Sequence, residues 1–202
     1  MGGFEQSLGD MGNGRYVRLL GQYDELSLDN RGRFRLPDNL VYMVRQELGR
    51  VRADEARLNQ APALERLAFY LVPGTRQRVF LYPVPNIDLA VQRFEDPPAD
   101  MPDDVIRRAR DYFYYRMRFV EADKQNRLAI PDGLREHGDI GEGVSHVSLI
   151  AHNHWLALTR SDLVEKQKGE NLEAFNQVAG DLLDPARPVR SRRPGEQDSS
   201  PE

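Results

Sequence analysis

The sequence predicts an α+β fold in which one unit of strands and helix occurs twice. The first observation is an internal repeat, because Asp29 to Pro37 (DNRGRFRLP) and Asp123 to Pro131 (DKQNRLAIP) share the pattern D-x-x-[GN]-R-apolar-x-apolar-P, 94 positions apart. Apolar residues at helical spacing follow each copy, and later paired segments alternate as β-hairpins do. With 202 residues, 40% of them hydrophobic, the chain is long enough to bury a core.

Each copy begins with residues that favour a tight turn. Asp29 at the first position can accept hydrogen bonds from the backbone amides that follow it, and Gly32 at the fourth position tolerates a positive φ. Copy two has Asp123 and Asn126 at these positions, and among the other residues Asn adopts the left-handed region most readily. We therefore expect the two copies to form equivalent turns.

The segments after the turns predict a strand, a helix and a hairpin in each copy. Residues 33–36 alternate polar and apolar side chains, with Phe34 and Leu36 toward the core. A helix is expected from Asp38 until Gly49 stops it. The same features predict the other elements of the repeats: a helix at 132–137, and hairpin strands at 67–73, 79–82, 147–151 and 155–158.

Between the copies we expect a helix at 87–94, a breaker-rich segment, and an arginine-rich helix at 104–119. The apolar stripe of this second helix comprises Ile106, Ala109, Phe113 and Met117. The chain is divided into a disordered N-terminus (1–14), repeat 1 (15–96), a linker and helix (97–119), repeat 2 (120–164), a C-terminal helix (165–185) and a disordered tail (186–202).

The composition limits the classes of function. A net charge of -4 argues against a chain that binds nucleic acid over its whole surface, so any DNA contact must come from a local patch. The absence of cysteine removes disulfides and thiolate metal sites, and it fits a reducing compartment. The N-terminus lacks a secretion signal, and no apolar segment approaches the ~18 residues of a membrane span. We expect a cytoplasmic protein that does not bind membranes.

His152-Asn-His154 is the strongest candidate for a metal site, since two imidazoles on one face of a strand can hold a metal. The triplet falls where the second hairpin must turn, and no third ligand lies nearby in the sequence. Gly141 to Ser145 lacks the spacing of a nucleophile elbow, and no phosphate-binding glycine loop is present. The sequence therefore predicts no catalytic residue, no metal and no cofactor.

The two repeats with a helical linker between them resemble the MraZ family of bacterial transcriptional regulators, over about Leu19 to Val164. The matching stretches are Leu20-Gly-Gln-Tyr23, Ser27 to Arg33, Leu81-Tyr-Pro83 and Asp123 to Arg135. This chain departs from the family in one extra residue before Ser27, in Asn126 for the usual Gly, in Leu158 for an aromatic, and in a long loop at about 49–66.

The resemblance implies two AbrB-like swapped-hairpin repeats that form a pseudo-twofold, β-barrel-like unit with flanking helices. It also implies a homo-oligomer, which is a ring in that family, and which binds double-stranded promoter DNA at short G-rich repeats upstream of division and cell-wall genes. The protein would then be nucleoid-associated. In the family, basic residues of the motif loops contact DNA. The matching positions in this chain imply that Arg33 is the foremost DNA contact and that Arg31 is the next.

The residues themselves support a basic loop. Arg31 falls at the tip of the first turn, and Arg33 and Arg35 project from one face of the strand, opposite Phe34 and Leu36. Arginine can grip a phosphate or the O6 and N7 edge of guanine with two bonds. Copy two has Gln125, Arg127 and Ala129 at these positions, with Lys124 beside them. We expect DNA binding by Arg31, Arg33, Arg35, Lys124 and Arg127, with the first repeat dominant.

Several alternatives stay open at this point. Arg33 and Arg127 can instead brace Asp29 and Asp123 within the turns, and Arg35 can be a solvated surface residue. The arginine-rich helix, with its tyrosines, can be a second nucleic-acid surface or only a linker. The arginines of the tail can form a basic arm. The competing function is an oligomeric scaffold whose arginine loop docks an acidic protein partner.

Overall fold

The computed structural model describes residues 16–56, 66–98, 101–166 and 168, and the chain divides into two compact units, Met1–Val164 and Glu165–Glu202. The expected disordered ends at 1–14 and 186–202 lie outside the described residues, as does nearly all of the helix expected at 165–185. Every element named below belongs to the first unit.

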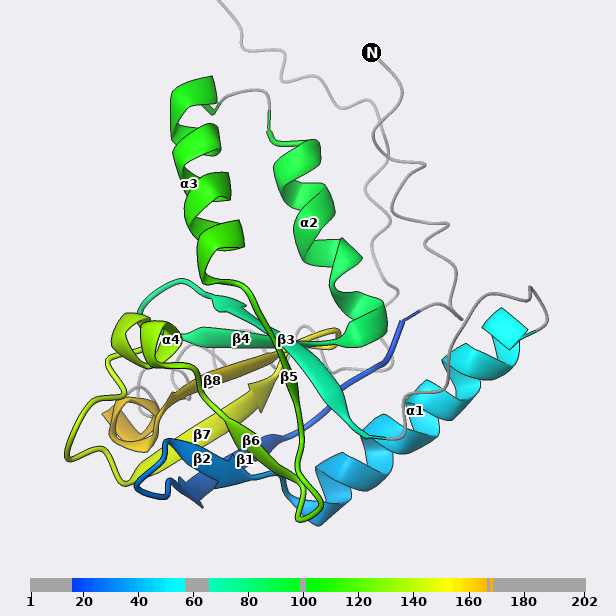
Figure 1. The fold of residues 1–202 in the computed structure, drawn as a ribbon, viewed down its shortest axis with the longest axis vertical. Helices are drawn as coiled ribbons and strands as arrows, with labels where there is room; N and C mark the ends of the chain where they lie inside the picture. Colours follow the sequence, from blue (N-terminus) through cyan, green and yellow to red (C-terminus); the bar gives the residue numbers. More distant parts are fainter. Residues whose placement is uncertain (1–15, 57–65, 99–100, 167, 169–202) are drawn as a thin grey trace, which may run out of the picture. The chain divides into compact units, whose positions relative to one another are not determined.

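The first unit is built around a six-stranded antiparallel sheet. Its strands lie in the order β1 (Gln22–Ser27), β7 (His146–Ala151), β8 (Leu156–Arg160), β4 (Val79–Pro83), β3 (Ala68–Pro73) and β5 (Arg118–Glu121). A separate ribbon pairs β2 (Arg33–Arg35) with β6 (Arg127–Ala129) (Figure 1). The helices are α1 (Asp38–Ala56), the 3-10 turn η1 (Val84–Asn86), α2 (Asp88–Glu95), α3 (Asp103–Arg116) and α4 (Asp132–His137). The α+β class is confirmed.

The strand order reads the same when the two copies of the repeat are exchanged. Exchanging β1 with β5, β3 with β7 and β4 with β8 only reverses the order of the sheet. The first strand of each copy pairs with the hairpin of the other copy, β1 with β7 and β5 with β3. The expected barrel-like closure is not found among the described residues, because β1 and β5 remain at the two edges and β2 pairs with β6.

β1 contains a bulge between Tyr23 and Leu26. Tyr23 faces Leu149 and Leu26 faces Val147, so three steps along β1 match two steps along β7. Glu25 adopts a φ of 56° inside the bulge. The bulge accommodates one additional residue while the strand resumes its register before the first turn.

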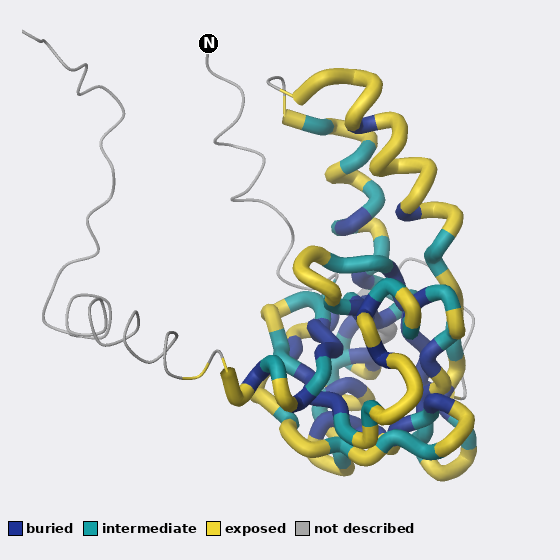
Figure 2. The backbone as a smooth tube through the Cα atoms, turned by 90° about the vertical axis from the view of Figure 1, so that its left-hand side faces the viewer, coloured by how far each residue is buried: buried dark blue, intermediate teal, exposed yellow. Residues whose placement is uncertain are grey.

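The core draws apolar side chains from both copies. Phe34 and Leu36, which were predicted to face inward, are buried, and so are their copy-two equivalents Leu128 and Ile130. These four side chains belong to one cluster with residues of the sheet, α1 and α4. Figure 2 shows that buried positions concentrate in the body of the unit, whereas α2 and α3, the two helices between the copies, project from it and are largely exposed.

α1 continues past Gly49, where the sequence predicted its end. Leu48 and Val51 on either side are buried in the core, so tertiary packing outweighs the roughly 1 kcal/mol that a glycine costs inside a helix. Gly49 itself is exposed, and a Cβ added there would meet no atom within 4 Å.

α2 and α3 form a helical hairpin, and α3 ends earlier than predicted. α2 confirms the helix expected at 87–94, but α3 stops at Arg116 because Met117 is extended and β5 follows, paired with β3. In the predicted stripe Ile106 and Phe113 are buried, whereas Ala109 is exposed. The rings of Phe113 and Phe94 lie 4.7 Å apart and join the two helices.

Both predicted hairpins and the helix at 132–137 are confirmed. His152-Asn-His154 lies in the β7–β8 turn, where His152 stacks on Trp155 with ring centres 5.5 Å apart and His154 contacts Tyr16. Burial, together with the charge of Arg78, lowers the pKa of His152. In the described part of the chain no three metal-ligating side chains cluster, and no helix there could cross a membrane.

Candidate nucleic-acid interface

Asp29 organises the first turn with both of its carboxylate oxygens. Its Oδ1 accepts hydrogen bonds from the backbone N–H groups of Arg31 and Arg33, at 2.9 and 3.0 Å. Its Oδ2 accepts from Nε and Nη2 of Arg33, each at 2.7 Å. The N–H of Gly32 donates to the Asp29 carbonyl at 2.9 Å. The guanidinium of Arg33 is therefore fixed against the turn that precedes it.

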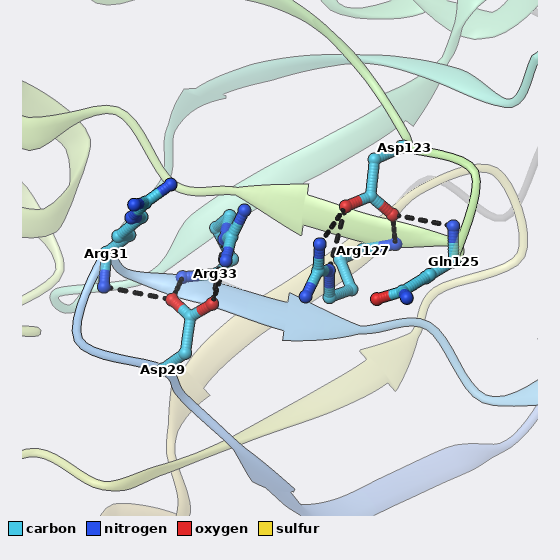
Figure 3. A network of polar contacts seen from close by, with 6 residues as sticks. All are labelled: Asp29, Arg31, Arg33, Asp123, Gln125 and Arg127. Carbon is cyan, nitrogen blue, oxygen red and sulfur yellow. Dashed lines mark hydrogen bonds and ion pairs between the residues drawn. The ribbon is translucent and has the colours of Figure 1, made fainter.

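Asp123 repeats these contacts in the second turn (Figure 3). Its Oδ1 accepts from the backbone N–H groups of Gln125 and Arg127, at 2.8 and 2.9 Å, and its Oδ2 accepts from Nε and Nη2 of Arg127, each at 2.7 Å. Asn126 donates its N–H to the Asp123 carbonyl at 2.9 Å. The predicted turns are confirmed in both copies, and both contain the aspartate–arginine brace.

The fourth residue of each turn is left-handed, as predicted. Gly32 has a φ of 66° and Asn126 a φ of 57°. Their carbonyls accept hydrogen bonds from the opposite copy: Ile130 N–H donates to Gly32 at 3.0 Å, and Leu36 N–H donates to Asn126 at 2.9 Å. Each turn is thus tied to the strand that leaves the other turn.

The braces hold both carboxylates ionised. The side-chain hydrogen bond from Arg33 lowers the pKa of Asp29 from 3.8 to about 2. The backbone and side chain of Arg127 lower the pKa of Asp123 to about 2 as well. The same hydrogen bond to Asp29 raises the pKa of Arg33. Both braces therefore remain ion pairs throughout the physiological pH range.

The β2–β6 ribbon brings arginines of the two copies onto one face. Arg35 pairs in register with Arg127, and Arg33 pairs with Ala129. Since Phe34 between the two arginines is buried, alternation places all four residues on the outward side. The basic residues of the two copies, which the sequence analysis treated separately, thus form one surface.

Two further predicted residues, Arg31 and Lys124, flank this face. Arg31 and Lys124 are exposed in the two turns, and the described residues offer neither of them an ion-pair partner. Arg35 donates from Nη2 to Asp38 at 2.9 Å, yet its side chain remains 64% exposed. We name the set of Arg31, Arg33, Arg35, Lys124 and Arg127 the ribbon patch.

Two arginines at the edges of the ribbon patch were missed by the sequence analysis. Nη2 of Arg45, on α1, lies 3.5 Å from Oδ1 of Asn126. The side chain of Arg135, on α4, lies against the other turn, because a Cβ added to Gly32 would be 2.9 Å from Arg135 Cδ. Each helix reaches the turn of the opposite copy, and no local sequence pattern reports such a long-range contact.

The fold and the site define an internally duplicated α+β protein with a braced, basic two-stranded ribbon. No protein-family model matches this chain, and no curated protein shows significant sequence similarity to it. The geometry of the ribbon patch therefore carries the functional argument.

Proposed function

We propose that this protein is a sequence-specific DNA-binding regulator of the MraZ type, composed of two AbrB-like swapped-hairpin repeats. The observation that carries the proposal is the register of the ribbon, which gathers Arg33, Arg35 and Arg127 on one outward face. The exchange of first strands between the copies supports the swapped-hairpin interpretation.

The local charge favours a polyanion in spite of the net charge of the chain. The ribbon patch has five basic residues, and its ion-pair partners are the three carboxylates of Asp29, Asp38 and Asp123. A positive excess therefore remains in a chain whose net charge is -4. Such a patch directs DNA to one face and leaves the rest of the surface repulsive.

The braces prepare Arg33 and Arg127 for recognition. Both bonds to Asp29 use Nε and Nη2 of Arg33, which leaves Nη1 for a phosphate oxygen or for a guanine edge. A guanidinium that is already oriented loses less side-chain entropy when it binds. The two turns have the same geometry, so we expect Arg127 to contribute to binding together with Arg33.

A single ribbon offers few contacts, and we therefore propose that several subunits act together on tandem G-rich boxes. Contacts after the first become intramolecular, which can raise the overall affinity by 10²–10⁴-fold. The proposed assembly is a homo-oligomer located at the nucleoid and acting on promoter repeats of division and cell-wall genes.

The test is a titration of duplex DNA followed by fluorescence anisotropy at several salt concentrations. One duplex contains tandem G-rich boxes and the other is a scrambled sequence. Arg33→Ala is expected to cost ~1–3 kcal/mol per engaged site, or about 5- to 150-fold, and to reduce the preference for the G-rich duplex. Arg31→Ala and Arg35→Ala are expected to weaken both duplexes alike and to lower the salt slope by roughly one unit each.

Two controls separate binding from folding. Arg107→Ala makes the same charge change at an exposed position of α3 and should leave both affinities unchanged. Asp29→Asn weakens the brace but keeps Arg33, so it reports the loss of melting temperature that comes from the turn alone. If all ribbon-patch variants bind the G-rich duplex like the wild type, the DNA proposal fails, and the scaffold with an acidic partner is favoured.

A further inference from the structure

Two arginines at the edges of the ribbon patch, Arg45 on α1 and Arg135 on α4, are poorly compensated by carboxylates. In the described part of the chain no carboxylate pairs with Arg45, and its Nη2 lies 3.5 Å from the neutral Oδ1 of Asn126. Arg135 donates from Nε to the Ile140 carbonyl at 3.3 Å, and its Nη1 lies 3.6 Å from Asp132, whose side chain is fully exposed. Such an exposed ion pair contributes little. We call Arg45 and Arg135 the flanking pair.

The pairing of β2 with β6 brings each member of the flanking pair to the turn of the other copy. The Leu36 N–H donates to the Asn126 carbonyl, so α1 begins beside the second turn. The Ile130 N–H donates to the Gly32 carbonyl, so α4 begins beside the first turn. The two turns lie at opposite ends of the antiparallel ribbon (Figure 3). The flanking pair therefore places one guanidinium at each end of the ribbon.

The repeat pattern does not account for these two arginines. At an offset of 94 positions, Asp139 is the equivalent of Arg45, and Val41 is the equivalent of Arg135. Asp139 pairs with Arg160 at 2.6 Å, and Val41 is buried. A role in the fold that both copies share would place arginine at equivalent positions. Instead, each copy provides an arginine from a different position, and both side chains reach the fourth residue of the opposite turn.

The fourth residue of each turn matches the arginine beside it. Gly32 leaves room for the stem of Arg135, since a Cβ at residue 32 would lie 2.9 Å from Arg135 Cδ. Asn126 has a side chain, and its Oδ1 faces Arg45. Both turn residues are left-handed, so the backbone requirement alone does not explain why one is glycine and the other asparagine. The side chain of Asn126 has a second use, which is to orient Arg45.

A guanidinium at each end of the ribbon suits the DNA backbone. A two-stranded ribbon fits the major groove of B-DNA, and sugar–phosphate strands border that groove on both sides. Contacts with phosphates fix the register of a protein on the duplex without reading its sequence. We propose that Arg45 and Arg135 bind phosphates on either side of the ribbon patch, and that Asn126 is a positioning residue for Arg45. This inference rests on the proposed function and adds two contacts that the ribbon patch does not contain.

The first test removes the orienting amide and keeps the turn. Glycine suits the φ of 57° at residue 126, so Asn126→Gly should not lower the melting temperature. Arg45 keeps its charge in this variant but loses its acceptor. The G-rich and the scrambled duplex should both bind about 2- to 12-fold more weakly, at an unchanged salt slope. In the Arg45→Ala background, which itself lowers the salt slope by roughly one unit, Asn126→Gly should have no further effect.

The second test separates the charge of Arg135 from its packing. Arg135→Lys keeps the charge and should keep the salt slope of the wild type. Arg135→Gln has an amide nitrogen at the same position along the side chain as Nε, but it lacks the charge and should lower the salt slope by roughly one unit for both duplexes. Arg107→Gln makes the same change at an exposed position of α3 and should leave the slope unchanged. Titrations below the melting range of each variant exclude loss of folding.

A wild-type salt slope for either Arg45→Ala or Arg135→Gln would overturn the assignment of backbone contacts, and so would a loss of binding confined to the G-rich duplex. Additive effects of Asn126→Gly and Arg45→Ala would overturn the positioning role of Asn126. If Arg33→Ala still weakens binding in such a case, only this inference fails. If Arg33→Ala also binds like the wild type, the proposed function fails with it.

Discussion

Gly32→Ala tests whether the first turn depends on its left-handed backbone. An L-residue with a side chain pays ~1–2 kcal/mol to adopt this region, and the alanine recovers only about 0.4–1 kcal/mol from its stiffer unfolded chain. The new Cβ would also lie 2.9 Å from Arg135 Cδ, so Arg135 must move away from the Ile140 carbonyl that it contacts at 3.3 Å. Loss of that hydrogen bond adds roughly 0.5–1.5 kcal/mol. We expect a net loss of about 0.5–3 kcal/mol.

Urea unfolding and thermal melting measure this loss. For a unit of this size, a loss of about 0.5–3 kcal/mol corresponds to a decrease in melting temperature of about 1–12 °C. Gly32→Asn separates the two causes, since Asn126 shows that asparagine fits the left-handed position, whereas any Cβ at residue 32 meets Arg135. Gly49→Ala is the matched control, because it lies inside α1 with open space and should stabilise by up to about 1 kcal/mol. An unchanged stability of Gly32→Ala would refute the reasoning.

The pKa values of Asp29 and Asp123 are about 2 in the folded protein, against 3.8 when unperturbed. The stability that the two braces provide is therefore present above pH 4 and is lost as the pH falls toward 2. The double variant Asp29→Asn, Asp123→Asn should show a shallower fall in melting temperature over this pH range. Asn86→Ala should lower the free energy of unfolding in urea by roughly 1–3 kcal/mol, because two buried hydrogen bonds are lost. The side-chain Oδ1 of Asn86 accepts from the Val17 N–H and its Nδ2 donates to the Val17 carbonyl, each at 2.8 Å. Wild-type stability of the variant would contradict this prediction. Arg45→Ala should leave the melt unchanged while it lowers the salt slope of DNA binding by roughly one unit, and a sequence-selective loss would show that Arg45 reads bases instead.

The turns could be predicted from the sequence because their determinants are local. Asp29 and Gly32 act within four residues of each other, and the substitution of Asn126 for glycine is understandable from its φ alone. The hairpins and α4 could be predicted from the alternation of polar and apolar side chains and from residues that end helices and strands, and these signals are equally local.

The remaining features depend on contacts between distant parts of the chain. α1 passes through Gly49 because Val51 finds a place in the core, and β5 replaces the end of a predicted helix because β3 offers it a partner. The pairing of Arg35 with Arg127 decides the composition of the candidate site, yet these residues are 92 positions apart. Periodicity predicts which face a residue occupies, but it does not predict what lies opposite.

The exchange of first strands makes the two copies indispensable to each other, since β1 completes the hairpin of copy two and β5 that of copy one. In a symmetric pair of separate chains, every substitution occurs twice and must be tolerated at both places at once. Within this single chain a substitution occurs once, so one copy can have Gln125 and Ala129 at the positions where the other has Arg31 and Arg35. The two halves of the surface can therefore differ in sequence although their folding depends on each other.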